Sequence, residues 1–215
     1  MASEITAVKA VLLDGMGTLL RLLPPAPALA QALGVDPATA ERAFRAEAGY
    51  YVLHHLEGSD PSSLGDLRRR CARVLAEAAG VDPDGALEAL MGSLRFEAFG
   101  DAAPVLRELR ARGLRLVVVS NWDCSLPEVL ERVGLRELVD EVVASAVVGA
   151  AKPAAAIFDA GLAAARCAPA QAVHVGDSPA NDVAGARAAG IRALLLDREG
   201  GGDLSSLEEL PALLS

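Results

Sequence analysis

Residues 8–18 read VKAVLLDGMGT, in which a bare apolar run over residues 8–13 ends in the polar segment 14–18. Similar apolar runs recur at residues 114–119, 142–144, 172–175 and 191–196. Because these runs lack the polar alternation of a half-exposed strand, they are typical of strands that are covered on both faces. The opening stretch therefore predicts the first strand of a buried parallel sheet.

Helical patterns separate the later runs. These patterns cover residues 101–112, 125–133, 153–166 and 181–189. Three of them stop at a glycine, the residue that commonly follows the end of a helix, and the pattern at 153–166 opens with Pro153 at a first-turn position. The alternation of helix and strand predicts an α/β fold with a Rossmann-like, doubly wound parallel sheet.

The stretch from residue 21 to 99 does not follow this alternation. It contains helical patterns only, such as 37–56 and 64–79, separated by turn signals that combine Gly, Asp and Pro. We therefore predict an all-helical cap domain (21–99) inserted after the first strand of a discontinuous core (1–20 and 100–215).

Composition limits the classes of function. The chain has 215 residues, of which 52% are apolar and 23% are charged, so it can bury a full core. Its formal charge of −9 and the absence of a basic stripe argue against a nucleic-acid partner. No run approaches the roughly twenty apolar residues of a membrane helix, and the three cysteines lack a CxxC spacing. We expect a cytoplasmic protein with reduced thiols and no membrane partner.

Polar residues follow the predicted strands at four places. They are Asp14-Gly15-Met16-Gly17-Thr18, Ser120-Asn121, Lys152 in a Lys-Pro pair, and Gly176-Asp177 with Asp182 five residues further on. In an open parallel sheet the ligand crevice lies outside the carboxyl ends of the strands, so these segments are expected to converge. Lys152 stands out because the chain has only two lysines among its twenty cationic residues.

Taken together, these residues predict a site for a phosphoryl group. Asp14 would act as the nucleophile, and Mg²⁺ would bind the carboxylates of Asp14, Asp177 and Asp182. Ser120 would hold phosphoryl oxygens and Lys152 would neutralise negative charge. We also assign substrate binding to residues that flank these groups in sequence: Gly15, Thr18 and Asn121.

These motifs resemble those of the haloacid dehalogenase superfamily of hydrolases, and the resemblance spans nearly the whole chain. The order Asp14 to Thr18, Ser120, Lys152 and Gly176 to Asp182 is the family order, and the helical insert resembles the family's helical cap. The resemblance implies a phosphatase that acts through an aspartyl-phosphate. It also implies that the backbone carbonyl of Met16 is a further metal ligand.

Met16 departs from the family pattern, in which a second Asp protonates the leaving group and activates water. A thioether can do neither, and losing a general acid/base lowers a rate by about 10²–10⁴. Three hypotheses stay open: a slow or leaving-group-selective phosphatase of a small phosphorylated metabolite, a non-catalytic protein that binds a phosphorylated ligand, and a 2-haloacid dehalogenase. The metal-type carboxylates favour the first over the last.

Several residues have two interpretations. Asp182 and Asp123 are also well placed to cap helices. The cap sequence brings together Tyr50, Tyr51, His54 and His55, whose i,i+4 spacing predicts one pair facing inward and one outward. A packing role is favoured for this cluster and for His174, and a solvated face for Arg68-Arg69-Arg70. The sequence specifies neither the substrate nor the oligomeric state.

Overall fold

The computed structural model describes residues 7–214, and its centre is a five-stranded parallel sheet. The strands are β1 (Ala10–Leu13), β4 (Arg115–Ser120), β5 (Glu141–Ala144), β6 (Ala172–Gly176) and β7 (Arg192–Leu195). Their order across the sheet is β5-β4-β1-β6-β7, and each neighbouring pair is parallel. All five predicted runs form strands, which confirms the predicted α/β fold.

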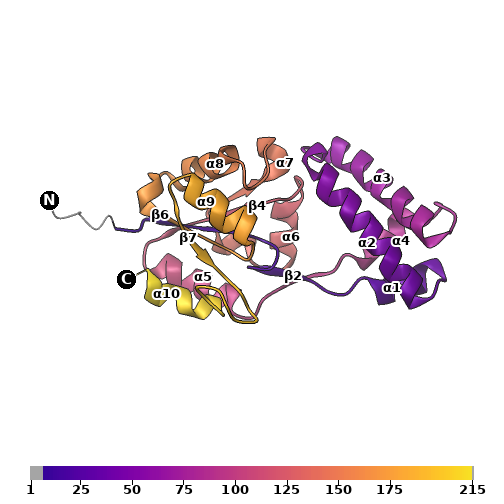
Figure 1. Cartoon of the computed structure of the whole chain (residues 1–215), viewed down its shortest axis with the longest axis horizontal. Coiled ribbons are helices and arrows are strands. Elements are labelled where there is room, and N and C mark those ends of the chain that lie inside the picture. The colour runs from indigo at the N-terminus through magenta and orange to yellow at the C-terminus, as the bar shows by residue number, and fades with distance from the viewer. Residues whose placement is uncertain (1–6, 215) are drawn as a thin grey trace.

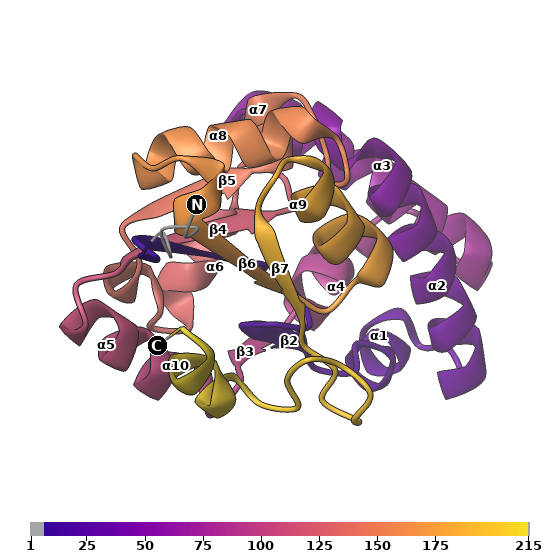
Figure 2. The same cartoon turned by 60° about the vertical axis from the view of Figure 1, so that its left-hand side comes forward.

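Helices cover both faces of the sheet (Figure 2). On one face, Val11, Leu13 and Val118 pack against α5 (Ala102–Ala111), α6 (Leu126–Arg132) and α10 (Leu210–Leu213). On the other face, Leu12 and Val119 pack against α8 (Ala155–Ala165) and α9 (Gly185–Ala188). Successive residues of a strand point to opposite faces, so a strand buried on both faces is apolar throughout. This explains the bare apolar runs of the sequence.

Four helices form a separate bundle, shown in purple in Figure 1, and we call residues 26–93 the cap. The cap helices are α1 (Ala26–Leu33), α2 (Pro37–His54), α3 (Pro61–Ala79) and α4 (Ala86–Ser93). They enclose their own apolar cluster, which includes Leu29, Leu67 and Leu75. The carboxylates of Asp36 and Asp60 accept hydrogen bonds from the backbone at the starts of α2 and α3, so the Asp-Pro turn signals begin these helices.

A short antiparallel ribbon joins the cap to the sheet. Its strands are β2 (Leu20–Leu22) and β3 (Phe96–Ala98), and they pair Leu20 with Ala98. The sequence did not predict these strands because each has only three residues and no long apolar run. The ribbon places the segment that leads into the cap beside the segment that returns from it.

Two predicted helices differ from the structure. Pro153 does not open α8, since the helix begins two residues later, at Ala155. The single helix predicted over residues 181–189 is a π-helical turn, η4 (Pro179–Ala184), followed by α9. The remaining helical elements are short: η1 (His55–Glu57), η2 (Arg136–Leu138), α7 (Ser145–Val148), η3 (Pro169–Gln171) and η5 (Leu207–Glu209). Within residues 7–214, no helix has both the length and the apolar character needed to cross a membrane.

Candidate active site

Asp14 lies at the point where the carboxyl ends of β1 and its neighbours β4 and β6 meet. Its backbone N–H donates to the Val175 carbonyl of β6 over 2.9 Å, which fixes the chain just beyond β1. The last residue of β4, Ser120, donates its hydroxyl to Asp14 Oδ1 over 3.0 Å. Both side chains are buried, at 5% and 2% relative exposure. The parallel register therefore brings together two predicted residues that are 106 positions apart.

Lys152 lies between two buried carboxylates. Its Nζ is 2.5 Å from Asp14 Oδ1 and 2.5 Å from Asp182 Oδ1, and the lysine is itself 5% exposed. Burial alone would lower the pKa of Lys152, but the charges and hydrogen bonds of the two aspartates outweigh burial and raise it. The ammonium is therefore charged and holds both carboxylates in place.

Three carboxylates converge beside this ammonium. Asp14, Asp177 and Asp182 each place one oxygen within 4.8 Å of the others' oxygens. Desolvation of its carboxyl, together with the negative charges of Asp14 and Asp182, raises the pKa of Asp177 to about 6. Such mutual repulsion is relieved by a bound cation, and hard oxygen donors are the ligands that Mg²⁺ prefers. The donor set therefore fits a magnesium ion.

His174 has a closer relation to the site than its sequence context indicated. Its Nε2 is 2.8 Å from Asp182 Oδ1, and the imidazole is fully buried in β6. Burial is the main cause that lowers the pKa of His174, so the neutral ring donates through Nε2–H to the carboxylate. The expectation of a buried histidine is met, but the sequence did not reveal that its partner would be Asp182. The only local signal was a polar residue inside an apolar strand.

Two glycines allow the loop after β1 to approach its neighbours. Gly17 has a φ of 81°, and a Cβ at this position would overlap the Asp177 carboxylate. A Cβ on Gly15 would lie 3.0 Å from Ser120 Oγ. Gly15 therefore lets the backbone of this loop lie close to Ser120, and it makes no side-chain contact of its own.

The other two residues that were assigned to substrate binding have different surroundings. Asn121 donates its amide to the Lys152 carbonyl over 3.0 Å and accepts from the Lys152 N–H over 2.7 Å, so it orients the lysine backbone. Thr18 is fully buried, and its hydroxyl has no hydrogen-bond partner among residues 7–214. The structure thus gives Thr18 no exposed atom with which to contact a substrate.

Arg198 was not predicted as part of the site, but it holds the loop that carries Asp14 and Met16. Its Nη2 donates to the Thr18 carbonyl over 2.8 Å, and its Nη1 is 2.8 Å from Asp101 Oδ2. The guanidinium also lies 3.7 Å from the centre of the Phe99 ring. Phe99 and Asp101 follow β3, on the segment that returns from the cap, whereas Thr18 lies on the segment that leads to it. Arg198 therefore joins these two segments.

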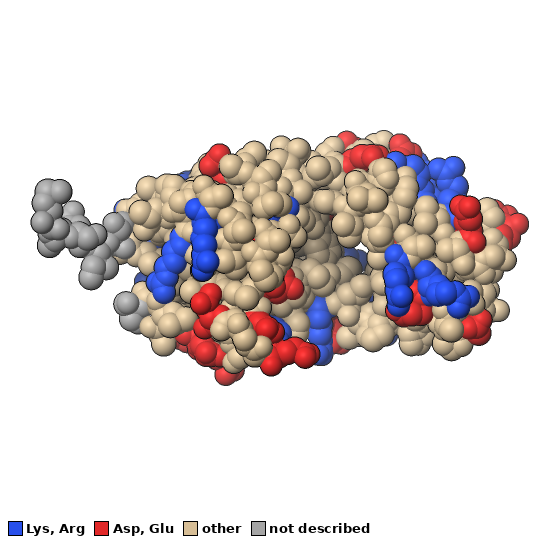
Figure 3. Space-filling view, in the orientation of Figure 1, with Lys and Arg blue, Asp and Glu red and all other residues tan. Residues whose placement is uncertain are grey.

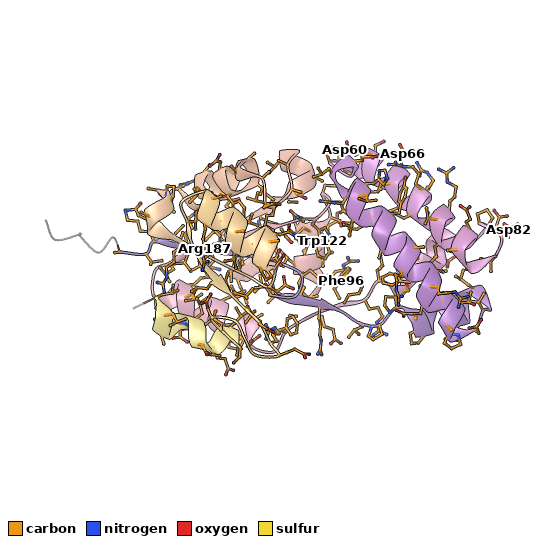
Figure 4. The ribbon with its side chains drawn as sticks, in the orientation of Figure 1. Asp60, Asp66, Asp82, Phe96, Trp122 and Arg187 are labelled. Carbon is orange, nitrogen blue, oxygen red and sulfur yellow. The ribbon has the colours of Figure 1, made fainter. Side chains whose placement is uncertain are left out.

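A cleft separates the sheet from the cap, visible as a hollow in the space-filling view (Figure 3). Its volume is about 400 Å³ and its lining includes Met16, Asn121 and Trp122 of the core. Figure 4 shows the side chains of Phe96 and Trp122 between the sheet and the cap helices, and their ring centres are 5.2 Å apart. The residue that replaces the expected second Asp therefore faces a largely apolar space.

The Tyr/His cluster of the cap divides between two faces of α2, as predicted. Tyr50 stacks on His54 at 4.1 Å between ring centres, on the side where His54 also lies 2.7 Å from Glu57. Tyr51 instead lines the cleft and donates its hydroxyl to Asp123 Oδ2 over 2.8 Å. Asp123 also accepts from the Ser125 N–H over 2.8 Å, so it caps its own loop while it binds the cap.

Arg68 behaves differently from the solvated face that was predicted for the arginine run. It lies half-buried in the lining of the cleft. Arg69 pairs with Asp66 and Arg70 pairs with Glu57 on the outside of the cap. The helical turn therefore directs Arg68 into the cleft, whereas Arg69 is exposed and Arg70 is half-buried beside Tyr50.

Comparison with known proteins places this geometry in a family. The model of haloacid dehalogenase-like hydrolases matches residues 8–190. The human haloacid dehalogenase-like hydrolase domain-containing protein 3 is 33% identical over 85% of this chain and 79% of its own length, while the match to its bovine counterpart spans only 38% of that protein. A phosphoserine phosphatase of Thermus thermophilus is 35% identical over 89% of each chain.

A solved structure agrees with these relatives. The HAD phosphatase of Thermococcus onnurineus has a TM-score of 0.67 and 26% identity, over 97% of this chain and 98% of that one. The family match covers the first strand, the cap and most of the sheet. On this evidence the chain belongs to the haloacid dehalogenase-like hydrolases.

Proposed function

We propose that this protein is a Mg²⁺-dependent phosphatase of a small phosphorylated substrate, with Asp14 as the nucleophile. The observation that carries the proposal is the convergence of Asp14, Asp177 and Asp182 within 4.8 Å, next to a buried ammonium. Three carboxylates and one lysine suit a dianionic substrate that arrives with a divalent cation. Phosphatase-named relatives, such as the phosphoserine phosphatase of Thermus thermophilus, support the same reaction class.

The two oxygens of Asp14 have different environments. Oδ1 accepts hydrogen bonds from Ser120 and Lys152, whereas no hydrogen bond to Oδ2 is formed within residues 7–214. We assign the attack on phosphorus to Oδ2, because its lone pairs are not engaged by the protein. A new oxygen–phosphorus bond forms at Asp14 while the bond to the leaving oxygen breaks, and water later hydrolyses the aspartyl-phosphate.

The remaining residues hold charge and geometry. Lys152 would balance negative charge that develops on the phosphoryl oxygens, and Ser120 would donate to one of them. His174 and Asn121 would act as positioning residues, through Asp182 and through the Lys152 backbone respectively. The carboxylates of Asp14, Asp177 and Asp182 and the carbonyl of Met16 would hold Mg²⁺, which when bound would neutralise the substrate's charge.

Because Met16 cannot transfer a proton, we expect both steps of the reaction to be slow. With no side-chain proton donor at this position, the leaving group departs as an anion, and the same absence slows the activation of water in the second step. We therefore expect a rate about 10²–10⁴ below that of an enzyme with the full acid/base pair for poor leaving groups. Substrates with good leaving groups should suffer less.

An assay with p-nitrophenyl phosphate tests the proposal. We expect turnover that needs Mg²⁺, stops on addition of EDTA, and falls to background in Asp14→Asn. Folded protein with no more activity than Asp14→Asn would refute the phosphatase. In that case, chloride release from 2-chloropropionate would indicate the dehalogenase, and Mg²⁺-dependent binding of phosphate without turnover would indicate a binding protein.

A further inference from the structure

The chemistry of the cleft beside Met16 narrows the class of substrate. Carbon-rich side chains from both sides form most of its wall: Met16, Leu22, Phe96 and Trp122 from the core and ribbon, and Phe44 and Leu90 from the cap. A volume of about 400 Å³ lies within the range of small-molecule sites and admits a one- or two-ring group. An apolar group that enters this cleft exchanges contact with water for contact with these side chains.

Polar groups of the wall are largely engaged within the protein. The Tyr51 hydroxyl donates to Asp123 and accepts from its N–H, and Asn121 is occupied by the Lys152 backbone. Glu47 is buried at 5% exposure, and burial raises its pKa, which favours the uncharged carboxyl. A polyol or sugar in this cleft would lose water without gaining matching hydrogen bonds.

The charged groups that stay available lie toward the edge of the cleft. Arg132 is exposed and Arg68 is half-buried, and neither forms an ion pair with any residue between 7 and 214. Their positive charge favours approach of a phosphate anion in a protein whose net charge is −9. They leave the apolar character of the wall around Met16, Phe96 and Trp122 unchanged.

The missing proton donor restricts the leaving group independently. A phenol has a pKa of about 10, as in tyrosine, whereas the pKa of an aliphatic alcohol is far higher and close to that of water. A phenolate therefore leaves without the help that Met16 cannot give, and an alkoxide does not. The shape and polarity of the cleft and the chemistry at Met16 thus select the same kind of group.

We propose that the substrate is an aryl phosphate whose ring lies in the cleft against Trp122, Phe96 and Met16. This inference rests on the proposed phosphatase function. In the first step the phosphorus–oxygen bond to the ring breaks as Asp14 Oδ2 bonds to phosphorus. The aryl oxygen keeps the electron pair, leaves as phenolate and takes its proton from solvent.

Binding of the ring is testable without turnover, because Trp122 is the only tryptophan of the chain. With Mg²⁺ and the Asp14→Asn variant, 2-naphthyl phosphate should change tryptophan fluorescence and bind about tenfold more tightly than inorganic phosphate. Phe96→Leu and Phe96→Ala should remove that advantage in graded order. Leu53→Ala, an 81% exposed position on the same cap helix as Tyr51, should leave it unchanged.

Turnover of a matched substrate set completes the test. We expect kcat/KM for phenyl phosphate to exceed that for cyclohexyl phosphate by at least about 10²-fold, the size of the missing acid's contribution. Acetyl phosphate has a good leaving group and no ring, so its hydrolysis tests the phosphatase alone. If acetyl phosphate is hydrolysed but 2-naphthyl phosphate binds no better than phosphate, the ring proposal is overturned and the phosphatase stands. If no phosphate ester or anhydride is hydrolysed, the phosphatase fails, and with it the substrate assignment.

Discussion

The residues packed around Asp14 and the lining of the neighbouring cleft form two unlike walls. In the first, which we call the sheet wall, every buried ionisable group has a partner of opposite or complementary character: Lys152 bridges Asp14 and Asp182, and His174 binds Asp182. The second, which we call the cap wall, is the lining of the cleft between sheet and cap and includes Met16; it is largely apolar, and its buried carboxyl, Glu47, has no ion pair in the described chain. A buried charge is tolerated where it is paired, and a buried apolar wall gains from excluding water.

The difference separates two tasks that the family usually combines beside the nucleophile. On our proposal, the sheet wall keeps what a dianionic phosphoryl group requires, namely Asp14 as nucleophile, an ammonium and a set of oxygens suited to a metal. The wall that would face the leaving group has a thioether at Met16. It can bury an apolar leaving group but cannot protonate it. On our proposal, recognition of the leaving group replaces part of its chemical activation.

The largest effect is expected from breaking the sheet wall. Lys152→Met would remove the cation between two buried carboxylates, so turnover should fall by at least about 10²–10³-fold. Without metal, the free energy of unfolding should drop by about 3–5 kcal/mol, because both buried carboxylates lose the ammonium between them. Steady-state kinetics with Mg²⁺ and denaturant unfolding in EDTA measure the two effects.

The chain provides a matched control for this change. Lys9 is its other lysine and is exposed at the opposite end of β1, so Lys9→Met removes the same charge without touching the site. Equal losses in the two variants would mean that net charge, rather than the pairing at Asp14 and Asp182, explains the result.

The next largest effect would make the cap wall resemble the sheet wall. Met16→Asp supplies the missing acid, and we expect hydrolysis of cyclohexyl phosphate to rise by about 10²-fold. Phenyl phosphate should gain much less, because its leaving group does not depend on protonation. The readout is kcat/KM for both substrates across pH.

Met16→Asn is the control for this second change. Its amide has a size and polarity similar to the carboxyl of Asp, but it does not ionise and cannot act as an acid or base. A rise of the same size in both variants, or for both substrates, would contradict the role assigned to position 16. The contrast between the two walls would then concern polarity only.

The two walls differ in how much of each the sequence could predict, because the sheet wall follows from the order of the strands and the cap wall from the packing of individual side chains. Apolar runs and strand-end motifs placed Asp14, Ser120, Lys152, Asp177 and Asp182 on one edge of a parallel sheet, because strand direction alone determines where their ends meet. The structure brings all five together. This part of the site needs only the order of the elements.

The cap wall depends on contacts that no local pattern specifies. The bond between Tyr51 and Asp123 joins residues 72 apart in different units, and β2 and β3 are too short to leave a periodic signal. The burial of Thr18 could not be predicted either, because the same motif is compatible with an exposed or a buried threonine. Side-chain direction on α2 and α3 decided which members of the clusters reached the cleft.

A smaller effect is expected from the contact that joins the walls. Burial raises the pKa of Tyr51, so its hydroxyl stays protonated and donates to Asp123. Tyr51→Phe should lower the free energy of unfolding by about 1–3 kcal/mol, since it leaves a buried carboxylate with one partner fewer. Tyr50→Phe, at the outer face, should have a smaller effect. Denaturant unfolding of the two variants at neutral pH tests this order, and a larger loss in Tyr50→Phe would reverse our assignment of the faces.

The smallest expected effect concerns Glu47, whose carboxyl is buried on the cap side. Burial raises its pKa above the ordinary value of 4.5, so the folded protein binds this proton more tightly than the unfolded chain does. Stability should therefore fall as pH rises from about 4.5 toward the raised pKa, and level off above it. Glu47→Gln removes this dependence because its amide does not titrate.

Relative to the wild-type protein, Glu47→Gln should gain stability at neutral pH, on the order of 1 kcal/mol or less, and the gain should vanish below the unfolded pKa. Denaturant unfolding at several pH values gives the difference directly. Glu41→Gln, at an exposed position of the same helix, controls for the lost charge. If Glu47→Gln were instead less stable at neutral pH, the carboxylate would have a favourable partner, and the cap wall would hold a paired charge as the sheet wall does.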